Sequence, residues 1–391
     1  MVGHRMETAR ILVVDDSKVS RMLLTRELEQ QGHQVASAEH GQQALAMLAE
    51  TVYDLILLDV EMPEMDGYQT LAALKNDETL RHLPVIMVTA IDDLSSAVRC
   101  IEMGSEDYLP KPFNPVLLRA RIGASLEKKR LRDQEQAYLK ALERELEIGR
   151  NIQQGFLPGK LPVVTGWEIA ASLEAAREVA GDFYDAFPVG SDGQICLVIG
   201  DVCDKGVGAA LFMTLFRSLL RFTMEAASAF LELTTAEKLN YAVTLTNNYI
   251  ANTHGDTGMF ATIFLGMLEP ESGRLTYINA GHEAPWIVQA GNLRAELTAT
   301  GMAVGLMAGY SYQVEQAQLE RGEVLLAFTD GIPDSRDPQR NPFGRDRLLA
   351  LLEISQQGAE VLIEAANQAL EAHIGAAEQY DDITLLVVRR L

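Results

Sequence analysis

The sequence predicts two α/β domains joined by a long helical segment. From residue 8 to 124, short apolar runs alternate with amphipathic segments, which is typical of a doubly wound, five-stranded parallel sheet. From 158 to 391, strand-like runs follow one another in hairpin-like succession, which predicts a mostly antiparallel α/β domain. The segment between them, 125–157, is rich in Glu, Lys, Arg, Leu and Gln and lacks proline, which favours a continuous helix.

The composition argues against several classes of protein. The 391 residues carry a formal net charge of -22, which disfavours nonspecific binding to DNA or RNA. The three cysteines form no Cys-X-X-Cys pair, which indicates a reducing, cytoplasmic compartment. We expect no signal peptide, because the first residues lack an apolar core. We also expect no membrane span, since the longest apolar run, 207–222, is too short and contains Arg217; it predicts a core helix.

Five apolar runs supply the strands of the first domain. Near-continuous apolar strands are expected where helices cover both faces of a parallel sheet. The intervening stretches have the three-to-four-residue spacing of amphipathic helices. The predicted strands are 10–14, 34–38, 54–59, 84–90 and 107–111.

The helical segment 125–157 carries an apolar stripe. Leu139, Leu142 and Leu146 follow three-four spacing, and Gly149 takes the next such position. A helix of this length, about 50 Å at 1.5 Å per residue, predicts a coiled-coil linker through which the chain forms a homodimer. The alternative is a solvated interdomain helix in a monomer. The prolines of "PGKLP" (158–162) end the helix.

The last domain mixes strand-like runs with three helical stretches. The expected helices lie around 207–226, 237–252 and 358–373. The expected strands are the runs "ICLVIGDV", "FATIFLGML", "RLTYINAG", "EVLLAFTDG" and "DDITLLVVRR".

Charged and polar residues stand at the ends of the strands of the first domain. Asp15 and Asp16 close the first strand, Asp59 the third, Thr89 the fourth and Lys111 the fifth. The carboxyl ends of parallel strands share one edge of a sheet, so these side chains should converge there. Clustered carboxylates suit Mg²⁺, which relieves their mutual repulsion. Beside Lys111 and Thr89, Asp59 would be the nucleophile that accepts a phosphoryl group.

With this pattern, residues 8 to 125 resemble a bacterial response-regulator receiver domain. The resemblance implies that a sensor histidine kinase phosphorylates Asp59 and that Thr89 and Lys111 contact the phosphate. It also implies that the main-chain carbonyl of Glu61 joins Asp15, Asp16 and Asp59 around Mg²⁺. Tyr108 matches the aromatic switch position; the alternative is an ordinary strand tyrosine.

Aspartates also mark the strand-like runs of the last domain. Asp182 lies in "VAGDFYD", Asp201 in "VIGDVCDKGVGAALF", Asp330 in "LLAFTDGIPDS", and Asp381 and Asp382 in "EQYDDITLLVV". Aspartates without histidine or cysteine neighbours at ligand spacing favour Mg²⁺ or Mn²⁺ over zinc. Two such ions can clamp a phosphate and activate a water.

These motifs, with "MFATIFLGML" and "NAGHEAP", resemble the metal-dependent PPM serine/threonine phosphatases, in particular their bacterial SpoIIE/RsbU branch. The resemblance runs from about 145 to 391 and implies an α/β sandwich of two mostly antiparallel sheets flanked by helices. It also implies a role for each of several residues. Two Mn²⁺ or Mg²⁺ ions would be held by the side chains of Asp182, Asp201, Asp330 and Asp381 and by the carbonyls of Phe183 and Val202. Asp382 would support a ligand, and His282 would be a turn residue. Arg177 matches a position where some relatives place a phosphate-binding arginine; the alternative is a surface arginine.

Together the two resemblances imply a two-component response regulator in which Asp59 phosphorylation controls a protein serine/threonine phosphatase. The substrate implied by the family is a phosphorylated anti-sigma factor antagonist, a small STAS-domain protein whose dephosphorylation frees a sigma factor. The alternative is an adaptor that binds a partner through a non-catalytic phosphatase-like domain. The four intact aspartates favour the enzyme.

Overall fold

The computed structural model describes residues 8–90, 94–190 and 192–391. The chain divides into two compact units, and the division falls between Leu142 and Glu143. The first unit has one sheet with an apolar core on each face, and the second has two sheets and three apolar cores.

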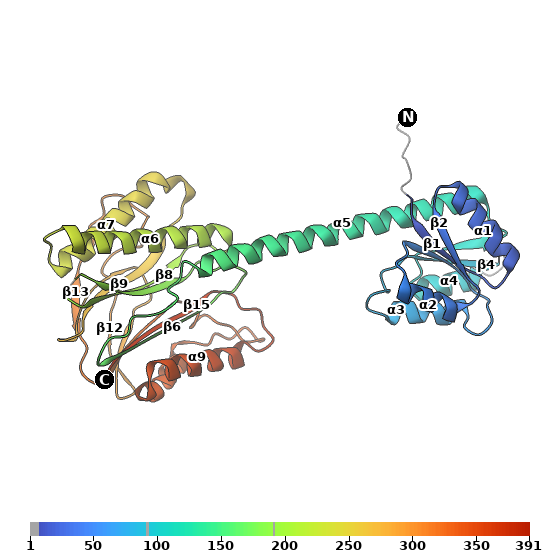
Figure 1. Ribbon diagram of the computed structural model, residues 1–391. Helices are drawn as coiled ribbons and strands as arrows, with labels where there is room; N and C mark the ends of the chain where they lie inside the picture. Colours follow the sequence, from blue (N-terminus) through green and yellow to red (C-terminus); the bar gives the residue numbers. More distant parts are fainter. Residues whose placement is uncertain (1–7, 91–93, 191) are drawn as a thin grey trace. The chain divides into compact units, whose positions relative to one another are not determined.

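The first unit is built on one five-stranded parallel sheet (Figure 1). The strand order is β2-β1-β3-β4-β5, and every neighbouring pair is parallel. This arrangement confirms the doubly wound sheet predicted from the sequence. The strands are β1 (Arg10–Val14), β2 (Gln34–Ala38), β3 (Leu55–Asp59), β4 (Val85–Ala90) and β5 (Asp107–Lys111).

Helices cover both faces of this sheet, so its strands are apolar on both sides. Leu28 of α1 and Ile122 of α5 belong to the core on one face. Leu48 of α2, Leu74 of α3 and Cys100 of α4 belong to the core on the other. The helices are α1 (Lys18–Gln30), α2 (Gly41–Glu50), α3 (Gly67–Asn76), α4 (Leu94–Glu102) and the first turns of α5 (Pro115–Gln154).

The helix α5 is longer than the sequence predicted. It runs from Pro115 to Gln154, whereas the sequence placed a separate helical segment at 125–157, ended by the prolines of 158–162. The side chain of Asn114 caps its start, because Oδ1 accepts a hydrogen bond from the Val116 N–H at 2.8 Å. Proline at the first helical position needs no hydrogen-bond partner, and nothing downstream breaks the helix. The last receiver helix and the expected linker are therefore one 40-residue element.

The second unit is a sandwich of two five-stranded, antiparallel sheets flanked by helices (Figure 1). One sheet has the order β13-β10-β9-β8-β7 and the other β12-β11-β14-β15-β6. Their neighbouring strands are antiparallel throughout, which confirms the expected fold class. The strands are β6 (Trp167–Glu174), β7 (Phe183–Val189), β8 (Gln194–Val202), β9 (Ala261–Glu269), β10 (Arg274–Ala280), β11 (Trp286–Gln289), β12 (Asn292–Glu296), β13 (Glu315–Gln318), β14 (Glu323–Phe328) and β15 (Ile383–Arg390).

Three apolar cores hold the layers of the sandwich together. Leu197 and Leu325 belong to the core between the sheets. Phe216 of α6 packs on the outer face of the first sheet, and Leu362 of α9 packs on the outer face of the second. The helices are α6 (Val207–Phe230), α7 (Thr235–Thr253), α8 (Arg345–Leu351) and α9 (Ala359–Ile374), with short 3-10 turns at Gly255–Thr257 and Leu352–Gln357.

The helix α6 extends the predicted core helix to 24 residues. Among the described residues it is the one helix long and apolar enough to cross a membrane by length and composition. Its inner side chains, including Met213, Phe216 and Leu220, are fully buried in the core on the outer face of the first sheet. Burial in the sandwich therefore accounts for the inner apolar side chains of α6, whereas Leu211 and Phe222 are exposed.

Candidate active sites

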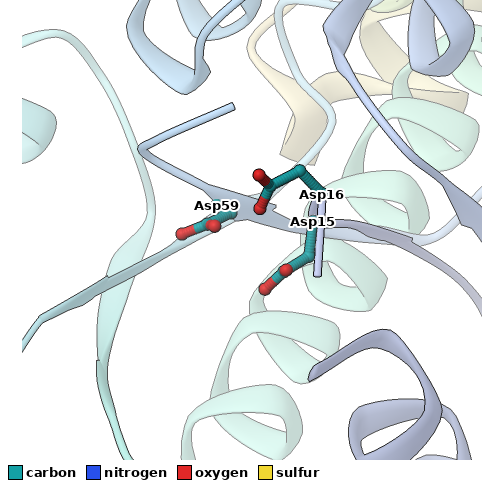
Figure 2. A group of neighbouring side chains, drawn as sticks. All are labelled: Asp15, Asp16 and Asp59. Carbon is teal, nitrogen blue, oxygen red and sulfur yellow. The ribbon is translucent and has the colours of Figure 1, made fainter. Parts of the chain in front are cut away.

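The first unit gathers three carboxylates at the carboxyl edge of its sheet (Figure 2). Asp15 and Asp16 directly follow β1, and Asp59 is the last residue of β3. Each offers a carboxylate oxygen, and these oxygens all lie within 4.8 Å of one another. Asp15 and Asp59 are buried, whereas Asp16 is exposed, so the group opens to solvent on one side.

Hydrogen bonds and one lysine hold the carboxylates in place. Asp15 accepts bonds from the Ser17 N–H at 2.8 Å and from the Ser20 hydroxyl at 2.6 Å. The Lys111 ammonium lies 2.8 Å from Asp15 Oδ2 and 2.7 Å from Asp59 Oδ2. Lys111 therefore joins the ends of β1, β3 and β5, as the parallel sheet predicts.

The electrostatics of this pocket suit a divalent cation. Burial raises the pKa of Asp59 to about 6, and the Asp15 charge adds to the effect while Lys111 opposes it. A hard cation with oxygen ligands would stabilise the ionised form of all three carboxyls. The residues present therefore fit Mg²⁺.

The other predicted receiver residues lie around this pocket. Thr89 is buried near the end of β4. Glu61 and Asp16 line one cavity of about 570 Å³ beside the carboxylates. Tyr108 on β5 is half-buried, and the guanidinium carbon of Arg121 lies 4.9 Å from its ring centroid.

The second unit brings its four predicted aspartates to one end of the sandwich. Asp182 immediately precedes β7, and Asp201 lies near the end of the neighbouring strand β8. Asp330 follows β14 by two residues, and Asp381 precedes the neighbouring strand β15 by two. The two sheets thus contribute two aspartates each.

Threonines of one sheet fix an aspartate of the other. The Thr329 and Thr384 hydroxyls both donate to Asp182 Oδ2, at 2.8 and 2.6 Å. Asp182 is 2% exposed, so these bonds satisfy an oxygen that water cannot reach. The Asp182 carboxyl also forms a side-chain hydrogen bond with Asp201, so the two candidate ligands are in direct contact.

Asp382 supports the loop before β7. Its carboxylate accepts backbone N–H groups from Ala176 at 2.8 Å, Gly181 at 2.6 Å and Asp182 at 3.3 Å. These bonds occupy both carboxylate oxygens and fix the backbone at Asp182. The contacts suit the supporting role that the sequence suggested for this residue.

Two glycines allow the segments that carry the aspartates to approach closely. A Cβ atom at Gly331 would lie 1.9 Å from the Asp382 carbonyl oxygen, so only glycine fits beside Asp330. A Cβ atom at Gly181 would lie 3.1 Å from the Val202 carbonyl oxygen. Backbone packing therefore brings the ends of β7, β8, β14 and β15 together.

The clustered carboxyls raise one another's pKa. Burial, followed by the charges of Asp330 and Asp381, raises the pKa of Asp201 to about 7. Burial, followed by the Asp201 charge, holds the pKa of Asp182 well above its usual value. Buried carboxylates without counter-charge are costly, and divalent cations remove that cost. An all-oxygen set of this kind fits Mn²⁺ or Mg²⁺.

Cationic side chains lie beside these aspartates. The Lys205 ammonium lies 2.8 Å from Asp381 Oδ2. A Cβ atom at Gly206 would lie 3.9 Å from Arg177 Nη1, so the Arg177 guanidinium is next to the loop that follows Asp201. The phosphate-binding role expected of Arg177 remains a prediction.

The last turns of α5 contact the segment that leads to Asp182. The Gln153 side chain hydrogen bonds to both the carbonyl and the N–H of Ala180, at 2.5 and 2.9 Å. One turn earlier, a Cβ atom at Gly149 would lie 4.0 Å from Val179. The helix is thus fastened two residues away from a candidate metal ligand.

The family model for Stage II sporulation protein E (SpoIIE) matches residues 191–391, and the model for the response regulator receiver domain matches residues 11–123. The first match covers more than half of the chain. The chain belongs to the SpoIIE family. It carries a SpoIIE-type PPM phosphatase domain after a receiver domain, as the sequence motifs suggested.

Several individual proteins are similar to parts of this SpoIIE-family chain. Protein IcfG of Synechocystis is 44% identical over 266 residues, which cover 63% of this chain but only 41% of IcfG. Phosphoserine phosphatase RsbU of Bacillus subtilis is 28% identical over 249 residues, 63% of this chain and 70% of RsbU. The SiaA-PP2C domain of Pseudomonas aeruginosa shares the fold, with a TM-score of 0.55 and 21% identity over 65% of this chain and 99% of that domain.

Sequence reasoning missed several residues of the SpoIIE-type site. Thr329 and Thr384 lie inside the motifs "FTDG" and "DDITLL", but a hydroxyl gives no sign of its distant partner. Lys205 lies in "DKG", and Gln153 is an ordinary helix residue by sequence. The N–H of His282, expected to be a turn residue, donates to Asn279 Oδ1 at 2.8 Å, and its buried ring also lies 3.0 Å from the Thr262 hydroxyl through Nδ1.

Proposed function

We propose that this chain is a cytoplasmic response regulator in which phosphorylation of Asp59 by a sensor histidine kinase controls a metal-dependent protein serine/threonine phosphatase. The convergence of Asp182, Asp201, Asp330 and Asp381 at one end of the sandwich is the observation that carries the proposal. Proteins with buried carboxylates in such numbers need cations to keep them ionised. The name of RsbU, a phosphoserine phosphatase, supports the same reaction class.

The residues of the phosphatase site divide into ligands and supports. Asp182, Asp201, Asp330 and Asp381 would hold two Mn²⁺ or Mg²⁺ ions, with the carbonyls of Phe183 and Val202. Bound ions would polarise the phosphate ester and acidify a water for attack on phosphorus. Thr329, Thr384 and Asp382 keep Asp182 in one orientation, and Arg177 would bind the phosphate of the substrate.

The residues of the receiver site divide in the same way. Asp59 accepts the phosphoryl group, and Asp15, Asp16 and the Glu61 carbonyl would hold Mg²⁺ with it. Lys111 and Thr89 contact the phosphoryl oxygens, and Tyr108 changes its packing when Thr89 engages them. The substrate class that we propose for the phosphatase is a phosphorylated anti-sigma factor antagonist with a STAS fold.

One set of assays tests this function. Hydrolysis of a phosphate ester, and of a phosphoserine-bearing STAS protein, is measured with added Mn²⁺, with and without Mg²⁺ and BeF₃⁻. We expect turnover in the wild type, none in Asp201→Ala or Asp330→Ala, and a response to BeF₃⁻ that is lost in Asp59→Asn. Asp77→Asn, which removes an exposed carboxyl of the receiver, should behave as the wild type. Folded wild-type protein without metal-dependent turnover would instead support the adaptor alternative.

A further inference from the structure

Lys205 engages an oxygen that a metal ion would need. Asp381 Oδ1 accepts the Asp382 N–H at 3.0 Å, and Asp381 Oδ2 lies 2.8 Å from the Lys205 ammonium. Both carboxylate oxygens of this candidate ligand are therefore engaged. Asp182 is held differently, since the Thr329 and Thr384 hydroxyls both donate to its Oδ2.

The position of Lys205 is fixed by its surroundings. Its ammonium also donates to the Tyr380 carbonyl and lies 3.8 Å from the centroid of the Tyr380 ring. Its backbone lies between Asp204 and Gly206, which both have positive φ, at 71° and 85°. A lysine held by a carboxylate, a carbonyl and an aromatic face loses the freedom of an ordinary surface lysine.

Lys205 is also the counter-charge of the cluster. Among the residues that the structure describes, it forms the only salt bridge to any of the five aspartates Asp182, Asp201, Asp330, Asp381 and Asp382. Burial raises the pKa of Asp330, and the charge of Lys205 opposes that rise. One positive charge thus already compensates part of the repulsion that a divalent ion would relieve.

We propose that Lys205 is an internal cation that competes with a metal ion for Asp381 and so sets a lower metal affinity than the aspartates alone would give. The proposal rests on the metal-dependent function proposed above. A like charge within a few ångströms of the ion disfavours its binding, and the lysine must leave Asp381 Oδ2 or share it. Removal of the ammonium should therefore strengthen metal binding. A substitution that merely damaged the site would weaken it.

Metal-dependent thermal stabilisation of the second unit tests this proposal. Trp167 and Trp286 are the two tryptophans of the chain, and both lie in that unit, so their fluorescence reports its unfolding alone. The Mn²⁺ concentration dependence of the midpoint gives an apparent Kd. At mildly alkaline pH we expect Lys205→Met and Lys205→Gln each to lower this Kd by about tenfold or more. Lys205→Arg, which keeps the charge, should stay close to the wild type.

A second lysine provides the matched control. Lys238→Met removes the same charge from α7, whose first residue Thr235 lies beside Gln194 at the opposite end of β8 from Asp201. We expect no change in its apparent Kd. An unchanged or weaker affinity in both Lys205→Met and Lys205→Gln would overturn the proposal. A wild-type protein without any Mn²⁺-dependent shift would instead overturn the proposed metal-dependent function.

Discussion

At the scale of single residues, the molecule buries polar groups and supplies partners for most of them. Asp182 receives two hydroxyls and Asp382 receives three backbone N–H groups. His282 is less fully satisfied: Nδ1 contacts the Thr262 hydroxyl, while Nε2 has no hydrogen-bond partner in the described residues. A buried imidazole in this setting is stable only in its neutral form.

This burial predicts a pH-dependent loss of stability. The pKa of His282 is lowered to about 4 by burial, whereas an unfolded chain has a histidine pKa of about 6.5. As pH falls from about 6.5 towards 4, the unfolded state gains a proton that the folded state cannot take. His282 should therefore cost up to about 3 kcal/mol of unfolding free energy over that window.

Urea unfolding of the metal-free protein, followed by tryptophan fluorescence, measures this effect. The raised pKa values of the aspartates increase the unfolding free energy as the pH falls. This contribution is the same in the wild type and in His282→Gln, so it cancels when the two are compared. We expect the wild type to lose about 2 to 3 kcal/mol more than His282→Gln between neutral pH and pH of about 4. Parallel pH profiles of the two proteins would contradict the assignment.

At the scale of elements, the end of α5 is a contact and not a free linker. The stripe of Leu139, Leu142, Leu146 and Gly149 continues with the same spacing to Gln153. At its end this stripe faces Val179 and Ala180 of the same chain. Since Gln153 fixes the backbone before Asp182, a change in the position of α5 would be transmitted to a candidate metal ligand.

We therefore predict that the Gln153 contact is needed for control by the receiver. Gln153→Leu keeps the size of the side chain but loses both hydrogen bonds to Ala180. Coupling of about 1 to 3 kcal/mol between the two sites corresponds to a 5- to 150-fold change in activity. Without the contact that carries this coupling, the ratio of phosphatase turnover with BeF₃⁻ to turnover without it should fall towards one. Gln154→Leu, one residue further along the helix, is the control. A normal BeF₃⁻ response in Gln153→Leu would exclude this contact as the route of control.

At the scale of the whole molecule, the sequence predicted which aspartates lie at the ends of strands. It missed the hydrogen bonds between residues that are far apart in the chain. Each aspartate follows or precedes an apolar run, so its place at an edge could be inferred from the alternation alone. The bonds to Asp182 join residues 147 and 202 positions apart, and no local pattern carries that information. The sequence also missed the strands β6, β7, β11, β12 and β13. Of these, β12 and β13 are mostly exposed and polar, so they lack the apolar signal of a strand.

The helix α5 is also the segment that both units share, since the division of the chain falls within it. Several of its apolar side chains are exposed, among them Tyr138 at 70% and Leu142 at 42%. Exposed apolar residues at three-four spacing are costly for a helix that remains alone in water. This cost supports the homodimer predicted from the sequence, with α5 as its seam.

Two double variants of α5 test whether its apolar stripe forms the dimer contact and whether that contact carries the signal. Leu142→Asp/Leu146→Asp places two charges on the apolar stripe, whereas Ala141→Asp/Arg144→Ala changes the net charge equally on another face of the helix. Light scattering should show a dimer for the wild type and the control, and a monomer for the stripe variant. If dimer packing of α5 carries the signal, the stripe variant also loses its response to BeF₃⁻, while Mn²⁺-dependent turnover persists because no metal ligand is changed. An equal BeF₃⁻ response in the wild type and the stripe variant would refute control through a helix dimer, and would leave the Gln153 contact within one chain as the route to Asp182.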